Sequence, residues 1–330
     1  GGAAKRELWA RQTRLDWDEA WPDAHLWCCE DPFLYVLRVK VLRDERVVDE
    51  TPEIRFGFRE FTQQGGTYLL NGVPTHLRGH QVDLAWGDKP GTLRELKDAG
   101  MNAFEFSGPI THLWKPTPRA FSYNPRVFEG VLNEADELGL IAIPCLPGAD
   151  QLQEAIFEEP VATLYRQRLA KHVRRYGNHP SICLWFMHFN LAGSHSSWHL
   201  APARIDGTYK TANGEFRRKE RFALEAQRFL REVDARPLYH HHCGNLGDAF
   251  TMNVYIGPET PVQEREEWPS QWAASRRLPL IACEHGLFLV PYWFRHRAFP
   301  LSDVYASEPL FEEFAARLLG PRAYEMLTPE

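Results

Sequence analysis

The sequence predicts an α/β fold in which parallel strands alternate with amphipathic helices, preceded by a short segment of antiparallel β-sandwich. A chain of 330 residues is long enough to bury a substantial core. Before about residue 60 the apolar residues alternate, as in Leu34–Leu42, which is typical of half-buried antiparallel strands. From Tyr68 onward, short apolar runs are separated by helical patterns, which indicates parallel βα units.

Composition argues against several functional classes. The chain is 44% hydrophobic, 13% aromatic and 25% charged, as in an ordinary soluble globular protein. Its net charge of −6 gives no electrostatic reason to expect nucleic acid or an anionic membrane as a partner. No apolar run approaches the roughly 18 residues that span a bilayer, and no signal peptide is evident. The six cysteines lack C-x-x-C or zinc-finger spacing, so we expect no metal or cofactor.

The second part of the chain predicts seven strands of an eight-stranded (β/α)₈ barrel. A barrel cannot leave its first and seventh strands unpaired, so we expect a cryptic eighth strand or, preferably, a chain truncated at its C-terminus. The expected strands are Thr75–Gly79, Met101–Phe106, Leu140–Cys145, Ile182–Phe189, Leu238–Cys243, Thr251–Tyr255 and Leu280–Glu284. The expected helices are Gly91–Ala99, Pro125–Leu138, Gln151–Tyr176, Glu215–Ala235, Pro261–Ala274 and Glu308–Leu319.

Polar residues gather at the predicted strand ends, where a barrel of this kind assembles its active site. Four segments carry the signal: LRGHQVD at Leu77–Asp83, NAFEFSG at Asn102–Gly108, NHPSICLWFMHFN at Asn178–Asn190, and LPLIACEHG at Leu278–Gly286. Together they resemble glycoside hydrolase family 2, which includes β-galactosidases, β-glucuronidases and β-mannosidases. The resemblance implies that residues 1–62 are the end of an immunoglobulin-like β-sandwich and residues 63–330 a TIM barrel.

The resemblance implies that Glu284 matches the nucleophile of the family's P-x-x-x-x-E-x-G segment. A carboxylate at a barrel mouth can attack an anomeric carbon, because the oxocarbenium-like transition state is stabilised by a nearby negative charge. The structural alternative is a strand-end glutamate paired with an arginine. Asn253 and Tyr255 in TMNVYIG resemble the strand-six segment, whose tyrosine touches the nucleophile.

Two positions depart from the family pattern. Counting W-x-x-x-N-E from Trp185 places Asn190 on the acid/base glutamate; one inserted residue would place Leu191 there instead. An asparagine cannot serve as the proton donor. In addition, Glu105 stands where the family has an arginine. Two carboxyls that share a site raise one another's pKa, so Glu105 is a candidate acid, with His188 as a second and no acid at all as a third possibility.

Several further side chains are candidates for substrate contact. His80 lies at the lip of the first predicted strand. In the run HHH, alternation along a strand lets His240 and His242 converge while His241 faces away. Two such ligands make a weak metal site, so we expect sugar recognition or packing. Trp293 can stack on the apolar face of a sugar.

We therefore expect a family 2 type glycoside hydrolase acting on a β-linked carbohydrate, retaining if it is active, with Glu284 as nucleophile and Asn190 at the usual acid/base position. The alternative is a catalytically silent barrel that binds carbohydrate or serves as a scaffold. A third interpretation uses Glu105 or His188 as the proton donor. The sugar, the linkage, the compartment and the oligomeric state stay open.

Overall fold

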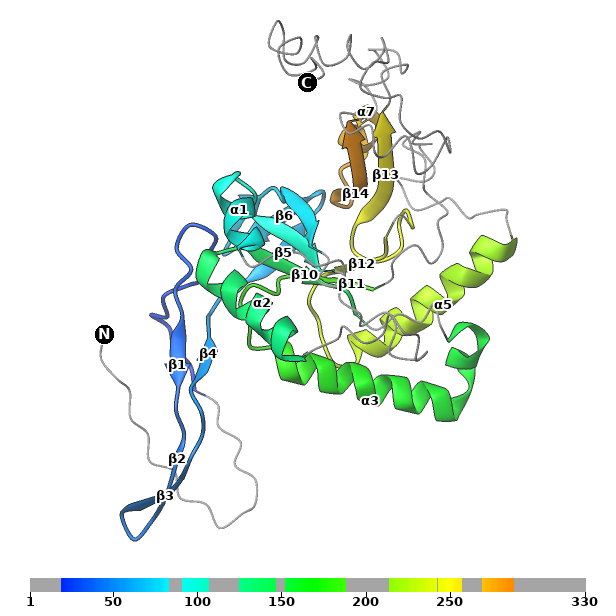
Figure 1. Cartoon of the computed structure of the whole chain (residues 1–330). Coiled ribbons are helices and arrows are strands. Elements are labelled where there is room, and N and C mark those ends of the chain that lie inside the picture. Colours follow the sequence, from blue (N-terminus) through cyan, green and yellow to red (C-terminus); the bar gives the residue numbers. More distant parts are fainter. Residues whose placement is uncertain are drawn as a thin grey trace, which may run out of the picture.

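The computed structural model describes residues 19–82, 91–106, 125–146, 152–187, 214–241, 243–256 and 269–287. These residues form a mixed α/β structure whose strands are antiparallel in the N-terminal part and parallel thereafter (Figure 1). The strands are β1 (Tyr35–Leu37), β2 (Lys40–Arg43), β3 (Arg46–Glu50), β4 (Ile54–Phe56), β5 (Phe61–Gln64), β6 (Thr67–Leu70), β7 (Val73–Thr75), β8 (Gly79–Val82), β9 (Ala103–Phe106), β10 (Ile141–Pro144), β11 (Trp185–Phe186), β12 (Leu238–Tyr239), β13 (Phe250–Ile256) and β14 (Leu280–Leu287). The helices are α1 (Thr92–Asp98), α2 (Pro125–Leu138), η5 (Gln153–Phe157, a 3₁₀-helix), α3 (Glu159–Tyr176), α5 (Gly214–Arg231) and α7 (Ser270–Ser275).

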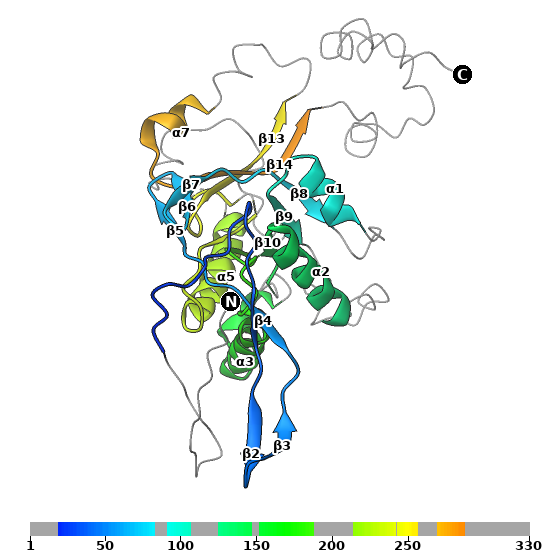
Figure 2. The same cartoon turned by 90° about the vertical axis from the view of Figure 1, so that its left-hand side faces the viewer.

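The N-terminal part consists of antiparallel pairs, as predicted. Strand β1 pairs with β4, and β2 pairs with β3 to form a hairpin that projects from the body of the molecule (Figure 2). Every residue of β2 and β3 is exposed. The predicted boundary between residues 62 and 63 falls within β5 and stays a prediction.

The expected first barrel strand, Thr75–Gly79, is wrong. Thr75 ends β7, which pairs antiparallel with β6, and the parallel strand β8 begins only at Gly79. The reason is a tight turn at Asn71-Gly72, where both residues have positive φ, 53° and 78°. An Asn-Gly pair of this conformation closes a two-residue hairpin, which sends the chain back along β6.

The parallel strands follow one another in chain order. Strands β8, β9 and β10 form one sheet, with β9 in the middle. Parallel bridges from Ala142 to Ile182 and from Cys145 to Phe186 connect β10 to the β11 segment, and β11 pairs with β12. Strands β13 and β14 form a separate parallel pair. The prediction of parallel βα units is confirmed, while the described strands do not form a complete barrel.

Alternating side chains place the apolar residues of the central strands in an outer and an inner core, because successive residues of a strand point to opposite faces. A third, smaller cluster contains Phe250, Met252 and Val254 of β13. The outer core lies between the strands and the helices α2, α3 and α5, which run along one side of the sheet (Figure 1). Phe104 and Phe106 belong to it, with Phe106 packed on Phe128 of α2 at 4.7 Å between ring centroids. The inner core lies on the opposite face and contains Ala103 and Tyr239.

The helices follow their amphipathic patterns, with one correction. Helix α2 has the predicted bounds, whereas the single helix expected over Gln151–Tyr176 is divided into η5 and α3. Glu158 is extended between them, with φ −84° and ψ 123°, and Pro160 occupies the first turn of α3, where proline is tolerated. None of the described helices is long and apolar enough to cross a membrane. The expected helix Glu308–Leu319 lies outside the described residues.

Candidate functional site

Glu105 is the polar residue of β9 on the inner face. It follows the fully buried Phe104 and lies in register with Gln81 of β8 and Ile143 of β10. Its Oε1 accepts a hydrogen bond from the hydroxyl of Tyr239 at the end of β12. The Tyr239 side chain is fully buried, so this bond lies in a place of low dielectric and is correspondingly strong.

The environment of Glu105 favours the protonated acid. Together, its surroundings raise the pKa of the Glu105 carboxyl to about 7. Burial is the largest cause, the Tyr239 hydrogen bond acts in the opposite direction, and the charge of Glu284 adds to the rise. The direction agrees with the expectation from sequence, but desolvation contributes more than Glu284. Burial also raises the pKa of Tyr239 well above its usual value, and the charge of Glu105 adds to the effect. Tyr239 therefore stays protonated and remains a donor.

Glu284 lies in β14 next to an irregularity in the strand pairing. Met252 pairs with Ala282, but the next residue, Asn253, pairs with Glu284, so Cys283 is the extra residue of a β-bulge. A bulge turns the side chains that follow it relative to a regular strand, and bulges are frequent beside active sites. The Glu284 side chain is 15% exposed, and its Oε1 lies 3.9 Å from Nε2 of His241.

His240 and His241 point to opposite faces, as predicted, but each points to the face expected for the other. His241 lies beside Glu284, and the expectation that it faces away is wrong. His240 instead points toward the helix layer, where its Nε2 is 2.9 Å from Oε1 of Gln227 on α5. The direction of each histidine follows from β12, because Leu238 belongs to the outer core and Tyr239 to the inner one, and the alternation continues into the histidines.

The other predicted site residues divide into four groups. Asn253 is buried and lies in register with Glu284. His80 is exposed and lies in register with the outer-core residue Phe104, so the structure does not bring it to Glu105. The backbone of Tyr255 pairs with Gly286, while its side chain is not among those described. The remaining candidates lie outside the described part of the chain: Asn190, His188, His242 and Trp293.

Sequence reasoning missed Tyr239 and His241. Tyr239 is 134 residues from its partner Glu105, and no local pattern marks a contact of that separation. The signal for His241 was present in the alternation of the run, but the phase required knowing which face of β12 is buried against helices. Across the described residues, no group of three or more His, Cys, Asp or Glu side chains could hold a metal ion.

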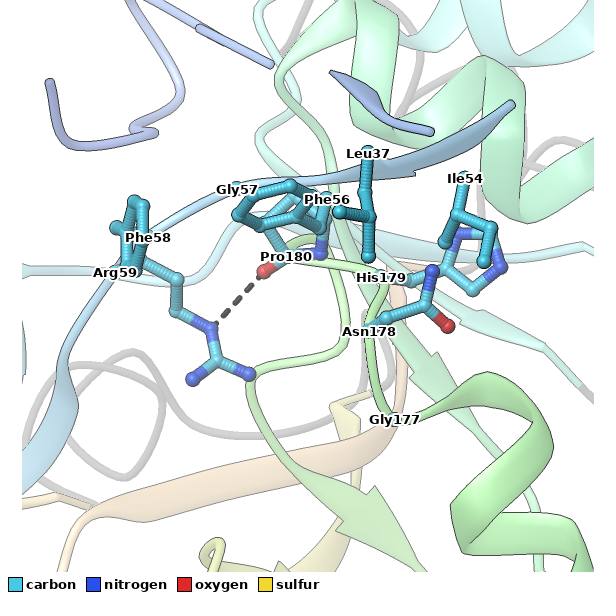
Figure 3. A pocket seen from close by; sticks show the side chains of 10 residues that line it. All are labelled: Leu37, Ile54, Phe56, Gly57, Phe58, Arg59, Gly177, Asn178, His179 and Pro180. Carbon is cyan, nitrogen blue, oxygen red and sulfur yellow. Dashed lines mark hydrogen bonds between the residues drawn. The ribbon is translucent and has the colours of Figure 1, made fainter. Parts of the chain in front are cut away.

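A cavity of about 350 Å³ lies elsewhere, between β4 and the turn Gly177–Pro180 (Figure 3). Its wall includes the apolar side chains of Leu37 and Phe56. Arg59 fixes one side, because its Nε donates to the carbonyl oxygen of Pro180 at 3.0 Å. Neither carboxyl of the inner face contributes to this cavity, which marks the joint between the N-terminal strands and the α/β part.

Comparisons with known proteins show which proteins this chain resembles. The model of the family described as "Glycosyl hydrolases family 2" matches residues 6–59. A β-glucuronidase of Streptococcus agalactiae is 26% identical over 185 residues, which are 49% of this chain and 28% of that protein. A β-galactosidase of Thermoanaerobacterium thermosulfurigenes is 29% identical over 274 residues, which are 82% of this chain and 33% of that protein. The chain thus spans a third or less of the length of these two curated relatives.

Solved structures agree at the level of the fold. The glycerol-bound crystal structure of a GH2 β-galacturonidase from Eisenbergiella tayi matches with a TM-score of 0.55 and 18% identity, covering 94% of this chain and 51% of that one. The Bacteroides uniformis β-glucuronidase matches with a TM-score of 0.54 and 20% identity, covering 80% of this chain and 31% of that one. The family model and the curated relatives thus make this chain similar to glycoside hydrolase family 2, and the solved structures show that the likeness extends to the fold.

Proposed function

We propose that this chain carries the core of a β-glycosidase site in which Glu284 is the nucleophile and Glu105 the acid/base. The observation that carries the proposal is the pair of carboxyls at the inner face, one on β9 and one on β14, close enough for the charge of Glu284 to raise the pKa of Glu105. The names of the curated relatives, a β-glucuronidase and a β-galactosidase, support a β-linked glycoside as the substrate.

In the proposed mechanism, the two carboxyls act in the two steps of a retaining reaction. In the first step, the protonated Glu105 donates its proton to the glycosidic oxygen while Glu284 attacks the anomeric carbon, so the leaving alcohol departs and a glycosyl ester forms on Glu284. In the second step, the Glu105 carboxylate takes a proton from water, whose oxygen attacks the anomeric carbon and releases Glu284. A group whose pKa is about 7 can act as acid and then as base near neutral pH.

His241 is the basic side chain nearest to Glu284 among the contacts described. In the family pattern an arginine stands at the position of Glu105, so the exchange removes a positive charge from beside the nucleophile. His241 lies 3.9 Å from Glu284 and carries a positive charge when it is protonated. We propose that it favours the ionised form of Glu284, which is the form that attacks.

Trapping of the glycosyl ester tests the proposal. An activated 2-deoxy-2-fluoro β-glycoside forms such an ester and releases it slowly, so the wild-type chain should gain the mass of one fluorosugar on the peptide that contains Glu284. Glu284→Gln should take up no label. Glu105→Gln should still be labelled by a reagent with a good leaving group, because that departure needs little protonation.

The alternative outcomes separate the remaining interpretations. Labelling of a different carboxyl would remove Glu284 from the role of nucleophile. No labelling with any fluorosugar, together with no hydrolysis of aryl β-glycosides, would favour the catalytically silent carbohydrate-binding barrel. A gain of activity in Asn190→Glu towards substrates with poor leaving groups, with Glu105→Gln unaffected, would mean that Glu105 is not the acid and that the wild type lacks an acid/base group at position 190.

A further inference from the structure

We infer that Tyr239 is a positioning residue for Glu105: its hydroxyl holds the carboxyl in one orientation and stabilises the carboxylate form between the two reaction steps. This inference rests on the proposed function, because it assigns Tyr239 a part in the acid/base cycle of the same site. Its geometric basis is the hydrogen bond from the Tyr239 hydroxyl to Oε1 of Glu105.

The ring of Tyr239 is held rigidly. It is fully buried and stacks on Phe186 of the neighbouring strand, with 5.7 Å between ring centroids and 14° between ring planes. The backbone of β12 is fixed as well, since the amide of Met187 donates to the carbonyl oxygen of Tyr239 at 3.0 Å. A donor that cannot move confines the carboxyl that it binds, so the orientation of Glu105 is set before a substrate arrives.

The hydrogen bond assigns different tasks to the two oxygens of Glu105. A tyrosine hydroxyl that stays protonated can donate to Oε1 whether the carboxyl is ionised or neutral. The transferable proton therefore belongs on Oε2. Because a hydrogen bond to a carboxylate is stronger than one to a neutral acid, Tyr239 favours the ionised form, which must abstract a proton from water in the second step.

Few charged or titratable groups act on this pair within the described part of the chain. Those that act on Glu105 are Tyr239 from β12 and Glu284 from β14. Those that act on Tyr239, besides Glu105, are Cys283 from β14 and Tyr68 from β6. Of these groups, Tyr239 alone donates a described hydrogen bond to Glu105, so its removal changes Glu105 in a way that the others do not reproduce.

The test compares Tyr239→Phe with Tyr68→Phe. Tyr68 is a matched control, since it is also a buried tyrosine of the inner core, and its hydroxyl has no hydrogen-bond partner among the described residues. Without the Tyr239 hydroxyl, Glu105 should keep its proton to higher pH. The alkaline limb of the pH–rate profile for an aryl β-glycoside should therefore move upward by roughly one pH unit in Tyr239→Phe, as expected when a hydrogen bond to a charged group is lost. It should not move in Tyr68→Phe.

A second readout does not depend on activity. The infrared band of the protonated Glu105 carboxyl, taken as the difference between each protein and its Glu105→Gln form, gives the midpoint of titration directly. We expect the midpoint to rise in Tyr239→Phe and to stay in place in Tyr68→Phe. If Tyr239→Phe does not fold, 3-fluorotyrosine at position 239 replaces it. Its more acidic hydroxyl is a stronger donor, so both the midpoint and the limb should then move downward.

The outcomes for the inference and for the proposed function are distinct. If the wild-type protein hydrolyses no β-glycoside, the proposed function is wrong. The infrared midpoints still report whether Tyr239 sets the pKa of Glu105. Hydrolysis with an alkaline limb that Tyr239→Phe leaves in place, or that Tyr68→Phe moves equally, overturns the inference and leaves the proposed function standing.

Discussion

At the scale of single residues, the inner face holds a buried carboxyl that is hydrogen-bonded to a tyrosine. Where the family pattern has an arginine beside the nucleophile, this chain has Glu105 bonded to Tyr239. Two carboxyls on one face repel each other unless one is protonated, and burial of Glu105 favours the same outcome. In the proposed site, this exchange supplies an acid at a position where the family pattern has a permanent cation.

A buried histidine of the outer core should make the protein sensitive to acid. Burial lowers the pKa of His172 from 6.5 to about 3, with the charge of Arg175 as a second cause. A pKa that is lower in the folded state means that protonation favours unfolding. The stabilisation is complete above pH 6.5 and is lost as the pH falls towards 3. In urea unfolding, the wild type should lose about 2 kcal/mol between pH 6.5 and 4.5 that His172→Phe retains.

The control for this prediction is His76→Phe, at an exposed histidine. Its unfolding free energy should follow the pH dependence of the wild type. Equal acid sensitivity in His172→Phe and the wild type would show that other groups, rather than the buried imidazole, cause the loss of stability.

At the scale of elements, irregular positions decide where the functional side chains lie. The extra residue Cys283 shifts the register of β14 against β13 directly before Glu284. The Asn71-Gly72 turn directs β7 back antiparallel to β6, so the parallel strands begin only at β8. Neither feature follows from hydrophobic periodicity, which fixes the existence of a strand more firmly than its register.

Two glycines near α2 should respond to alanine in opposite directions. Gly139 follows the helix with φ +68°, and a Cβ there would lie 2.3 Å from the carbonyl oxygen of Cys29. Gly139→Ala should lower the free energy of unfolding by about 2 kcal/mol or more. Gly130 lies inside α2 with no atom within 4 Å of an added Cβ, so Gly130→Ala should raise it by about 0.5 to 1 kcal/mol. Urea denaturation measures both; equal effects would contradict the assigned geometry of Gly139.

At the scale of the whole molecule, the sequence predicted the succession of elements better than the contacts between them. Helix α2 was predicted with its observed bounds because its apolar residues follow one face. The division of η5 from α3 was missed although Pro160 marks it. The Glu105–Tyr239 bond could not be predicted, since it joins two strands through the fold alone.

The charge of the inner face should also govern the choice of substrate. The ionised carboxyl of Glu284 repels the carboxylate of a uronic acid, and at about 6 Å with an effective dielectric constant of about 20 this repulsion costs about 3 kcal/mol. Aryl β-galactosides should therefore have a kcat/KM at least roughly tenfold higher than the corresponding β-glucuronides. Below pH 7, where Glu105 is protonated, the Glu105→Gln form should keep this discrimination, because the substitution leaves the charge of Glu284 in place. A wild-type preference for the glucuronide would contradict this account.

The pH dependence of hydrolysis in the wild type and in Glu105→Gln tests the central claim most directly. Glu105 must be protonated to act as the acid, and its pKa is raised to about 7, so wild-type activity on an aryl β-glycoside should be present below pH 7 and lost as the pH rises through it. In Glu105→Gln the alkaline limb should disappear. The rate on a substrate with a poor leaving group should fall about a hundredfold or more. An unchanged limb and an unchanged rate in Glu105→Gln would show that Glu105 is not the acid.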